Sequence, residues 1–233
     1  MNTYVDKAAL IAEEYKEFTH IVSHDLAAPL RHIKEFTRLL IDARQGDPTA
    51  DEKEYIKFLE ISLMKLNGMQ RALLDFSRIN TQVTAPSETD CNEIAASVLS
   101  DSVGVINERL TIIECGDLPT IMADKKQIHS VFMNLISNAL TFHAENSLER
   151  KVTITASDEG DSYGFAVNDN GIGIAETDHE QVFRLFCRLN QDAYPGIGAG
   201  LTIAKKIVDR HGGKIALVSD LSGGTCVNFW LPK

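Results

Sequence analysis

Residues 167–174, VNDNGIGI, follow an alternating apolar run and contain two closely spaced glycines. A strand over residues 163–167 would place its apolar side chains on one face, and the period of two extends that face to Asp169. A buried carboxylate needs a hydrogen-bond donor, and a ligand amine could be that donor if the protein supplies none. Gly171 and Gly173 would let the backbone approach such a ligand closely. The alternative is a tight turn capped by the aspartate.

A second motif lies on a predicted amphipathic helix over residues 125–142. Its apolar stripe comprises Ile128, Val131, Phe132, Leu135, Ile136, Ala139 and Leu140. Asn134 and Asn138 are four residues apart, so they share a face, which is turned away from the stripe. They are either solvated asparagines or oxygen ligands for a hard cation such as Mg²⁺.

A third motif, YPGIGAGL at residues 194–201, opens a helix predicted over residues 200–210. Gly196, Gly198 and Gly200 would expose several backbone N–H groups at the helix start, where the helix dipole favours an anion. The glycines do not follow a strand directly, which argues against a dinucleotide-binding fold.

The elements around these motifs alternate between strands and helices. Further strands are predicted over residues 110–114, 151–156, 214–218 and 226–231. Further helices are predicted over residues 90–100, where Asp90 could be the N-terminal cap, and over residues 176–183. Hairpin-like strand pairs mixed with helices predict an α+β two-layer sandwich, with helices on one face of a mostly antiparallel sheet. This domain would span residues 90–233, after a linker over residues 81–89.

The first 80 residues have a different pattern and predict a helical hairpin. Helices are expected over residues 6–44 and 51–79, joined by a turn over residues 45–49. A short loop makes the two helices antiparallel neighbours. Their broad apolar stripes would stay exposed in one chain, so the hairpin predicts a four-helix bundle formed by a homodimer.

His24 lies on the solvent side of the first predicted helix. A surface histidine usually has no special role. Here Asp25 follows directly, and Pro29 lies inside the helical pattern, where it removes a backbone hydrogen bond. A neutral imidazole is a nucleophile near neutral pH, and a neighbouring carboxylate can hold one ring N–H while the other nitrogen attacks.

Composition limits the classes of function. The chain has 233 residues and a formal net charge of −10, which opposes general nucleic-acid binding. Its four cysteines show no CxxC or zinc-finger spacing and are expected to be free thiols. No apolar run reaches the ~20 residues of a membrane helix, and the N-terminus does not resemble a signal peptide. A cytoplasmic location is expected for the chain, which could also be a fragment of a longer protein.

The motifs together resemble the catalytic core of sensor histidine kinases over about residues 12–232. Ser23–Leu26 with Pro29 and Leu30 resembles the H box, closest to the subgroup that includes kinases attached to phytochrome-type light sensors. The remaining motifs resemble an ATP-binding domain of the Bergerat fold. They are the N box at Asn134 and Asn138, glycine boxes at Asp169, Gly171 and Gly173 and at Gly196, Gly198, Gly200 and Leu201, and the F box at Phe183 and Phe186.

The resemblance implies a protein-histidine kinase that uses ATP and Mg²⁺. His24 would be the phosphoacceptor and Asp25 its acid/base helper. Asn138 would coordinate Mg²⁺, and Asn134 would support the phosphate side. Asp169 would accept a hydrogen bond from the adenine amino group, and Phe142 would pack near adenine. Residues 184–196 would form a mobile lid, from which Arg188 could reach the phosphates. The implied partners are a response regulator receiver domain and an upstream sensor that this chain lacks.

Three departures qualify the resemblance. Thr141 stands where the N box usually has lysine, so one phosphate contact could be lost. Ala27 replaces an arginine of the H box. Ala28 stands where kinases that also dephosphorylate their partner carry Thr or Asn, and a methyl group cannot orient water. Two alternatives to a kinase remain open: a Bergerat-fold ATPase that drives a conformational clamp, and a non-catalytic module that only docks a regulator.

Overall fold

The computed structural model describes residues 27–42, 46, 49–81, 84–102, 111–143, 149–189, 194, 196–221 and 223–233. The chain divides into two compact units, 1–78 and 79–233. In the part of the chain that is described, no helix is both long and apolar enough to cross a membrane. All four cysteines are free thiols.

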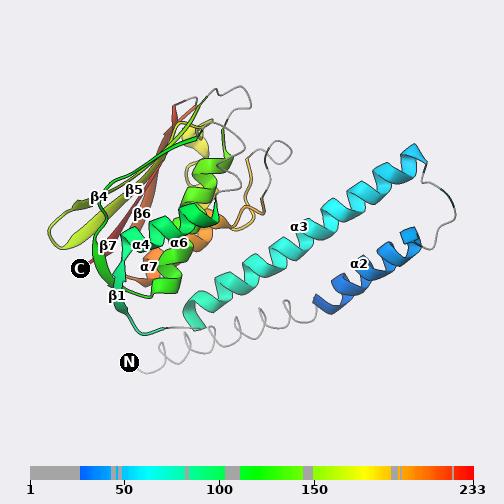
Figure 1. The fold of residues 1–233 in the computed structure, drawn as a ribbon, viewed down its shortest axis with the longest axis horizontal. Helices are drawn as coiled ribbons and strands as arrows, with labels where there is room; N and C mark the ends of the chain where they lie inside the picture. Colours follow the sequence, from blue (N-terminus) through cyan, green and yellow to red (C-terminus); the bar gives the residue numbers. More distant parts are fainter. Residues whose placement is uncertain are drawn as a thin grey trace. The chain divides into compact units, whose positions relative to one another are not determined.

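The described part of the first unit is helical, with α2 (Ala27–Asp42) followed by α3 (Ala50–Thr81) (Figure 1). Thr49 and Glu52 form a capping box at the start of α3. The Thr49 N–H donates to the Glu52 carboxylate at 2.8 Å, and the Glu52 N–H donates to Thr49 Oγ1 at 3.4 Å. Two helices joined by a short connection agree with the prediction, although α2 ends two residues earlier and α3 two residues later than expected.

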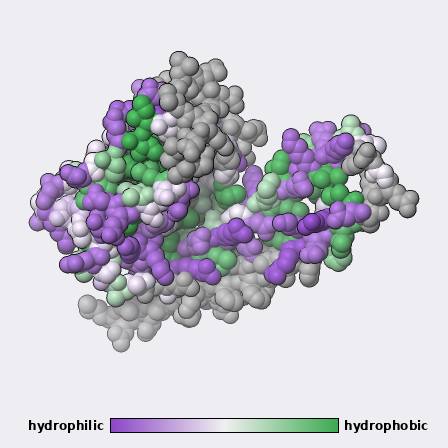
Figure 2. All heavy atoms as spheres, in the orientation of Figure 1, coloured by the Kyte–Doolittle hydropathy of each residue, from purple (hydrophilic) through white to green (hydrophobic). Residues whose placement is uncertain are grey.

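Large apolar side chains of both helices remain exposed. On α2, Phe36 is 63% exposed and Leu40 is 74% exposed; on α3, Phe58 is 60% and Met64 is 66% exposed. Hydrophobic residues are visible among charged ones on these helices in Figure 2. Exposed apolar side chains that gather on one surface are typical of an interaction site.

The second unit is built on a five-stranded sheet of order β2-β4-β5-β7-β6. The strands are β2 (Thr111–Cys115), β4 (Arg150–Asp158), β5 (Ser162–Asp169), β6 (Lys214–Asp220) and β7 (Gly224–Pro232). β2 runs parallel to β4, and the other neighbours are antiparallel. Helices α4 (Cys91–Asp101), α6 (Lys125–Thr141) and α7 (Gly200–Arg210) cover one face of this sheet (Figure 1). The predicted α+β sandwich is therefore confirmed.

The core between helices and sheet centres on three phenylalanines. Phe132 of α6 meets Phe165 of β5 edge-on at 5.9 Å and Phe229 of β7 edge-on at 5.8 Å, and the two strand residues stack at 4.7 Å. All three are at most 2% exposed. The predicted apolar stripe of α6 therefore packs on the sheet, so the opposite face of this helix is available for other contacts.

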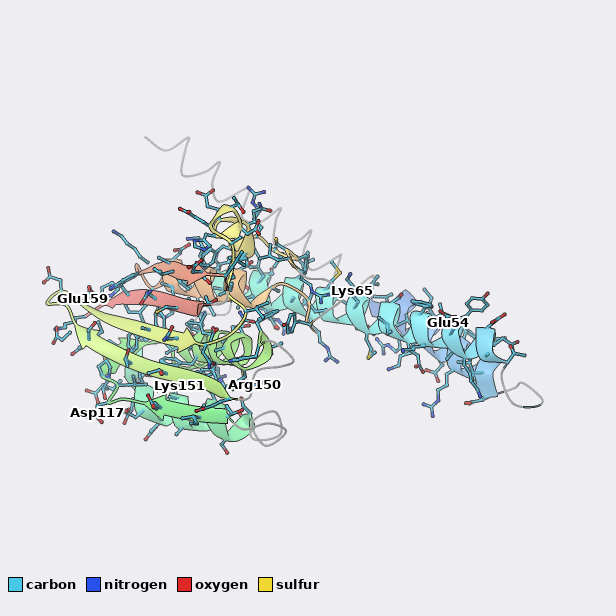
Figure 3. All side chains as sticks on the ribbon, turned by 90° about the horizontal axis from the view of Figure 1, so that it is seen from above. Glu54, Lys65, Asp117, Arg150, Lys151 and Glu159 are labelled. Carbon is cyan, nitrogen blue, oxygen red and sulfur yellow. The ribbon has the colours of Figure 1, made fainter. Side chains whose placement is uncertain are left out.

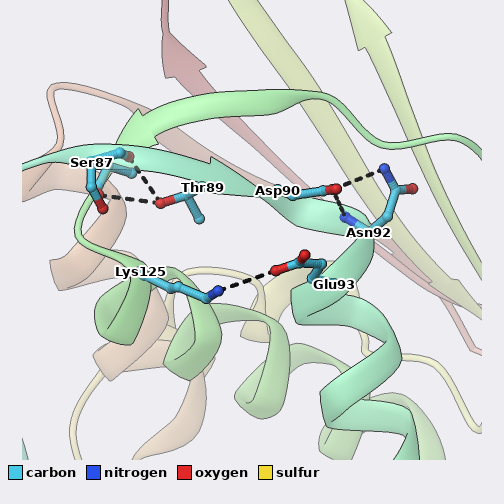
Figure 4. Close-up of polar contacts among 7 residues, drawn as sticks. Ser87, Thr89, Asp90, Asn92, Glu93 and Lys125 are labelled. Carbon is cyan, nitrogen blue, oxygen red and sulfur yellow. Dashed lines mark hydrogen bonds and ion pairs between the residues drawn. The ribbon is translucent and has the colours of Figure 1, made fainter.

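A small second sheet, formed by β1 (Ser87–Asp90) and β3 (Thr120–Ala123), was not predicted from the sequence, and part of it lies in the predicted linker. β1 pairs antiparallel with β3, so the predicted linker over 81–89 is wrong at residues 87–89, and Thr81 belongs to α3. Thr89 is fully buried, and its hydroxyl donates to the Ser87 carbonyl at 3.0 Å (Figure 4). A four-residue strand without alternation gives no periodic signal. The predicted cap is confirmed, because Asp90 Oδ1 accepts from the Asn92 N–H at 2.8 Å.

The last turn of α3 belongs to the second unit. Ile79 is 6% exposed, and its carbonyl oxygen accepts hydrogen bonds from Gln127 Nε2 of α6 at 3.0 Å and from Arg210 Nη1 of α7 at 2.5 Å. Carbonyls in the last turn of a helix have no partner within the helix. These two side chains satisfy one of them and attach the end of α3 to α6 and α7.

Candidate functional site

Helix α6 holds the two asparagines of the site on its face away from the core. Asp124 caps the helix by accepting from the N–H groups of Lys126 and Gln127. Asn134 Nδ2 donates to the Ser130 carbonyl at 2.7 Å and to the Ser130 hydroxyl at 3.3 Å, and its Oδ1 accepts no hydrogen bond from the described residues. Within the described residues, the half-buried side chain of Asn138 makes no hydrogen bond. Both side chains therefore have an amide oxygen that a ligand could use.

Asp169 ends β5 and carries a perturbed carboxyl group. Its Oδ1 accepts hydrogen bonds from the Gly171 N–H at 2.8 Å and from the Thr225 N–H at 3.2 Å. Burial raises the pKa of Asp169 to about 6, although these two bonds act in the opposite direction. The expectation that a ligand could be the donor if the protein supplies none is therefore wrong for Oδ1, which has two protein donors. No donor to Oδ2 lies among the described residues, so a ligand amine could still bind there.

Gly171 lets the loop after β5 approach the end of α6. A Cβ at this position would lie 2.1 Å from the carbonyl oxygen of Phe142, which no side chain can tolerate. The same carbonyl accepts a hydrogen bond from the Ile172 N–H at 3.0 Å. Phe142, 37% exposed, and Asp169 are thereby held close together on adjoining segments.

Helix α7 begins without the side-chain cap that α4 and α6 have. In the described structure no side chain accepts from its first N–H groups, which follow the predicted glycine run. Gly200 packs against α6, where a Cβ would lie 2.9 Å from Asn134 Oδ1. Leu201 is half-buried in the first turn. Uncapped N–H groups beside an amide oxygen form a polar surface that suits an anion and its counter-cation.

The segment between β5 and α7 contains two 3₁₀ helices, η1 (Glu176–Asp178) and η2 (Gln181–Phe183), where one short helix was predicted. The Phe183 carbonyl accepts from the Thr202 hydroxyl of α7 at 2.9 Å. Phe186 has a positive φ of 65°, which a non-glycine residue adopts at a cost, and its N–H donates to the Gly198 carbonyl at 2.8 Å. This segment is thus attached to the start of α7.

The structure brings most of the predicted site residues together. Close contacts join Asn134 with Gly200 and Gly171 with Phe142, and a hydrogen bond joins Phe186 with Gly198. Gly173 lies against the carbonyl group of Asp220, the last residue of β6, and a Cβ at Gly196 would meet no described atom within 4 Å. Arg188 donates to the Tyr194 carbonyl. His24 and Asp25 lie outside the described residues.

Three residues near the site were not selected from the sequence: His143, Asn170 and Tyr194. The Tyr194 hydroxyl donates to the His143 carbonyl at 3.0 Å, and His143 Nε2 lies 3.0 Å from Asn170 Oδ1. Asn170 and Tyr194 stand within the quoted glycine motifs, but nothing in the spacing indicated these contacts. His143 carried no signal, because its burial depends on segments distant in sequence.

The donor set fits a nucleotide with a divalent cation. A half-buried carboxylate and an exposed aromatic ring lie on adjoining segments, and the amide oxygen of Asn134 on α6 lies beside the uncapped start of α7. The described residues contain no group of three or more His, Cys, Asp or Glu side chains that could hold a metal by themselves. A hard cation held by one or two protein oxygens normally completes its shell with water and substrate phosphates, as Mg²⁺ does.

Comparisons with known proteins agree with this reading. Residues 123–233 match the family described as histidine kinase-, DNA gyrase B-, and HSP90-like ATPase. Phytochrome-like protein Cph1 of Synechocystis sp. is 34% identical over 220 residues, which cover 94% of this chain and 29% of that protein. The methanogenesis regulatory histidine kinase FilI of Methanothrix harundinacea is 30% identical over 223 residues, which cover 94% of this chain and 25% of that protein.

Solved structures show the same fold. Full-length ShkA in complex with AMPPNP superposes with a TM-score of 0.67 at 24% identity, covering 93% of this chain and 45% of ShkA. Histidine kinase ThkA in complex with the response regulator protein TrrA superposes with a TM-score of 0.66 at 23% identity, covering all of this chain and 67% of ThkA. The chain spans less than a third of the length of the two curated relatives named above.

Proposed function

Because this chain belongs to the histidine kinase family, we propose that it binds ATP with Mg²⁺ and transfers the γ-phosphoryl group to its own His24. The observation that carries the proposal is the half-buried carboxyl of Asp169. Its pKa is raised, and its Oδ2 accepts no hydrogen bond from the described residues, so a ligand amine could donate to it. A carboxylate with this environment beside an aromatic side chain is suited to the amino edge of a purine.

In this proposal the ATP site has a base end and a phosphate end. At the base end, Asp169 accepts from the adenine amino group and Phe142 packs on the ring. At the phosphate end, the N–H groups at the start of α7 face the phosphates. Asn138 ligates Mg²⁺, which neutralises phosphate charge and holds the phosphates in place when bound. Further residues are proposed to form the phosphate end of the site or the lid over it. They are Asn134, Gly173, Phe183, Phe186, Arg188, Gly196, Gly198 and Leu201.

The phosphoryl transfer needs only a neutral imidazole and correct positioning. One ring nitrogen of His24 forms a bond to the γ-phosphorus as the bond from phosphorus to the bridging oxygen of ADP breaks. Asp25 would hold the proton on the other ring nitrogen. The phosphoryl group would then pass to an aspartate of a response regulator receiver domain, and an upstream sensor would control the reaction. ThkA has been solved with such a regulator, which supports this partner class.

The exposed apolar residues of the hairpin support a homodimer. Phe36, Leu40, Phe58 and Met64 are each at least 60% exposed in the single chain. Pairing two hairpins into a four-helix bundle would bury such side chains, each contributing roughly 1.5–3 kcal/mol when fully buried. We therefore assign dimerisation to the α2–α3 unit.

Thr141 and Ala28 narrow the proposed activity. The Thr141 hydroxyl donates to the Ser137 carbonyl at 2.7 Å, one turn earlier on α6, so it is occupied within its own helix. The usual lysine contact to phosphate is then missing, and weaker phosphate binding is expected. Ala28 has no group that could orient an attacking water, so weak or absent phosphatase activity is expected.

Labelling with γ-³²P-ATP and Mg²⁺ tests the proposal. Label should appear on the protein, be labile to acid and stable to base, and disappear in His24→Ala. His20→Ala, four residues earlier on the same predicted helix, is the matched control and should retain the label. ATP hydrolysis without protein label would instead favour a conformational ATPase, and absence of nucleotide binding would favour a docking module.

A further inference from the structure

Tyr194 is attached to the end of α6 by its ring and its hydroxyl group. The ring lies 5.3 Å from the ring of Phe142 at a tilt of 58°. The hydroxyl donates to the His143 carbonyl at 3.0 Å, and the Tyr194 carbonyl accepts from Arg188. Two independent contacts therefore place this tyrosine against the Phe142–His143 dipeptide.

His143 holds the same dipeptide from the inside of the domain. It is 2% exposed, and its Nε2 lies 3.0 Å from Asn170 Oδ1. That oxygen also accepts from the Lys151 N–H at 2.7 Å, which identifies it as the acceptor, so His143 Nε2 carries the hydrogen. Asn170 Nδ2 donates to the Glu149 carbonyl at 3.2 Å, so both ends of this side chain are used.

The imidazole of His143 is held neutral. Burial and the nearby charge of Arg150 lower the pKa of His143, and the bond to Asn170 offsets this only in part. Arg150 and Lys151 lie at the start of β4 (Figure 3). No partner for His143 Nδ1 lies among the described residues. A proton on this atom would be a buried charge beside an arginine, which the site disfavours.

These contacts fix Phe142 relative to Asp169. The Phe142 carbonyl accepts from the Ile172 N–H, and the side chain of the following residue, His143, is bonded to Asn170. Asn170 and Ile172 both belong to the loop that follows Asp169. Tyr194 supports the Phe142 ring from the other side. The aromatic ring and the carboxylate at the base end of the site thus have a set separation.

We propose that His143 and Tyr194 are positioning residues for the base end of the nucleotide site. They act through Phe142: His143 ties it to the Asp169 loop, and Tyr194 buttresses its ring, so that together they set the surface on which the purine packs. This rests on the proposed ATP binding. Because the effect is at the base end, ATP and ADP must be affected by the same factor, and the maximal rate must change little.

Tyr194→Phe and Tyr194→Ala in the full chain separate the two contacts. Phenylalanine removes only the bond to His143, worth about 0.5–1.5 kcal/mol, so ATP and ADP affinity by calorimetry should fall about two- to thirteenfold. Alanine also removes the ring contact and should reduce affinity about five- to 150-fold. In autophosphorylation, half-saturating ATP should rise by the same factors. Tyr163→Phe, on the distant end of β5, should leave both measurements unchanged.

A double-mutant cycle tests whether the effect runs through Phe142. In a Phe142→Ala background, Tyr194→Ala should change affinity by less than about twofold, because the ring that it supports is gone. His143→Gln keeps an N–H donor and should retain more ATP affinity than His143→Ala. Melting curves identify any His143 variant that does not fold. In that case, the Tyr194 variants alone test the proposal.

Several outcomes would overturn the proposal. They are unchanged or tighter binding in Tyr194→Ala, a larger loss for ATP than for ADP, additive effects of the Tyr194 and Phe142 variants, or a fall in maximal rate at unchanged half-saturating ATP. If the unmodified chain binds neither ATP nor ADP, the proposed function itself fails. If it binds both and Tyr194→Ala binds equally well, only the positioning role fails.

Discussion

Asp169→Asn should make the nucleotide-free protein more stable and the ATP complex weaker. The pKa of this carboxyl rises from its ordinary value of 3.8 to about 6 because burial disfavours its charge. At ~1.4 kcal/mol per pKa unit, the ionised group costs about 3 kcal/mol of stability at pH 7. Asparagine keeps an oxygen for the N–H groups of Gly171 and Thr225 but loses the charge assistance to these bonds. The expected net gain is about 1–3 kcal/mol.

ATP binding should move in the opposite direction. The asparagine oxygen would remain with the two backbone donors, so the amide NH₂ would face the adenine amino group, and two donors cannot pair. Losing a hydrogen bond to a charged acceptor costs about 1.5–3 kcal/mol, or roughly ten- to 150-fold in affinity. Thermal melts and calorimetric titration with ATP measure the two effects. Asp117→Asn, exposed and distant from the site, is the control and should change neither.

The pH dependence fixes the sign of the stability effect. Because the folded-state pKa is raised, the protonated carboxyl favours the folded state, and this stability is full below pH ~3.8 and lost as pH rises to about 6. The stability advantage of Asp169→Asn should therefore be small near pH 4 and constant above about pH 6.5. A variant that is less stable than the original chain at pH 7, or an advantage that grows toward low pH, would refute this account of Asp169.

Three further predictions follow from the site and the hairpin. Asn138→Ala should weaken Mg²⁺-dependent ATP binding at least about tenfold while changing binding in EDTA little, and Asn138→Asp, which keeps an oxygen ligand, should retain more of it; titration with and without metal measures this. Gly171→Ala should cost at least about 2 kcal/mol of unfolding free energy, because its Cβ would lie 2.1 Å from the Phe142 carbonyl, whereas Gly116→Ala, whose Cβ would lie 3.7 Å from the nearest atom, should be nearly neutral in thermal melts. Leu40→Glu, at a side chain 74% exposed, should shift the chain from dimer to monomer in analytical ultracentrifugation, while Arg38→Ala on the same helix should not; a dimer unaffected by Leu40→Glu would contradict the assignment of dimerisation to this surface.

Local patterns predicted the elements that carry the site. The stripe on α6 identified its buried face, and the parity of β5 placed Asp169 on the core side, because both depend only on residues a few positions apart. The Asp90 cap was predicted for the same reason. Burial of the α6 stripe also left Asn134 and Asn138 on the opposite face, as expected.

The contacts between motifs could not be predicted in this way. β1 pairs with β3 about thirty residues away, and neither strand has an alternating pattern long enough to recognise. His143 is buried by the loop that holds Asn170, and the partner of Asp169 at Thr225 lies on β7. Such pairings depend on the order of strands in the sheet. The sequence therefore indicated candidate site residues, and the fold was needed to show which described residues contact one another.

The strand order also determines which strands of this protein could pair with another molecule at high concentration. β2 and β6 are the outer strands of the sheet, and the outward N–H and C=O groups of an outer strand can pair with a strand of another molecule. β2 has only five residues and carries Glu114, which pairs with Lys151 at 2.8 Å. β6 starts at Lys214 and ends at Asp220, with Val218 68% exposed between them. Changing the charges on β2 and β6 should therefore alter this edge pairing without altering the core.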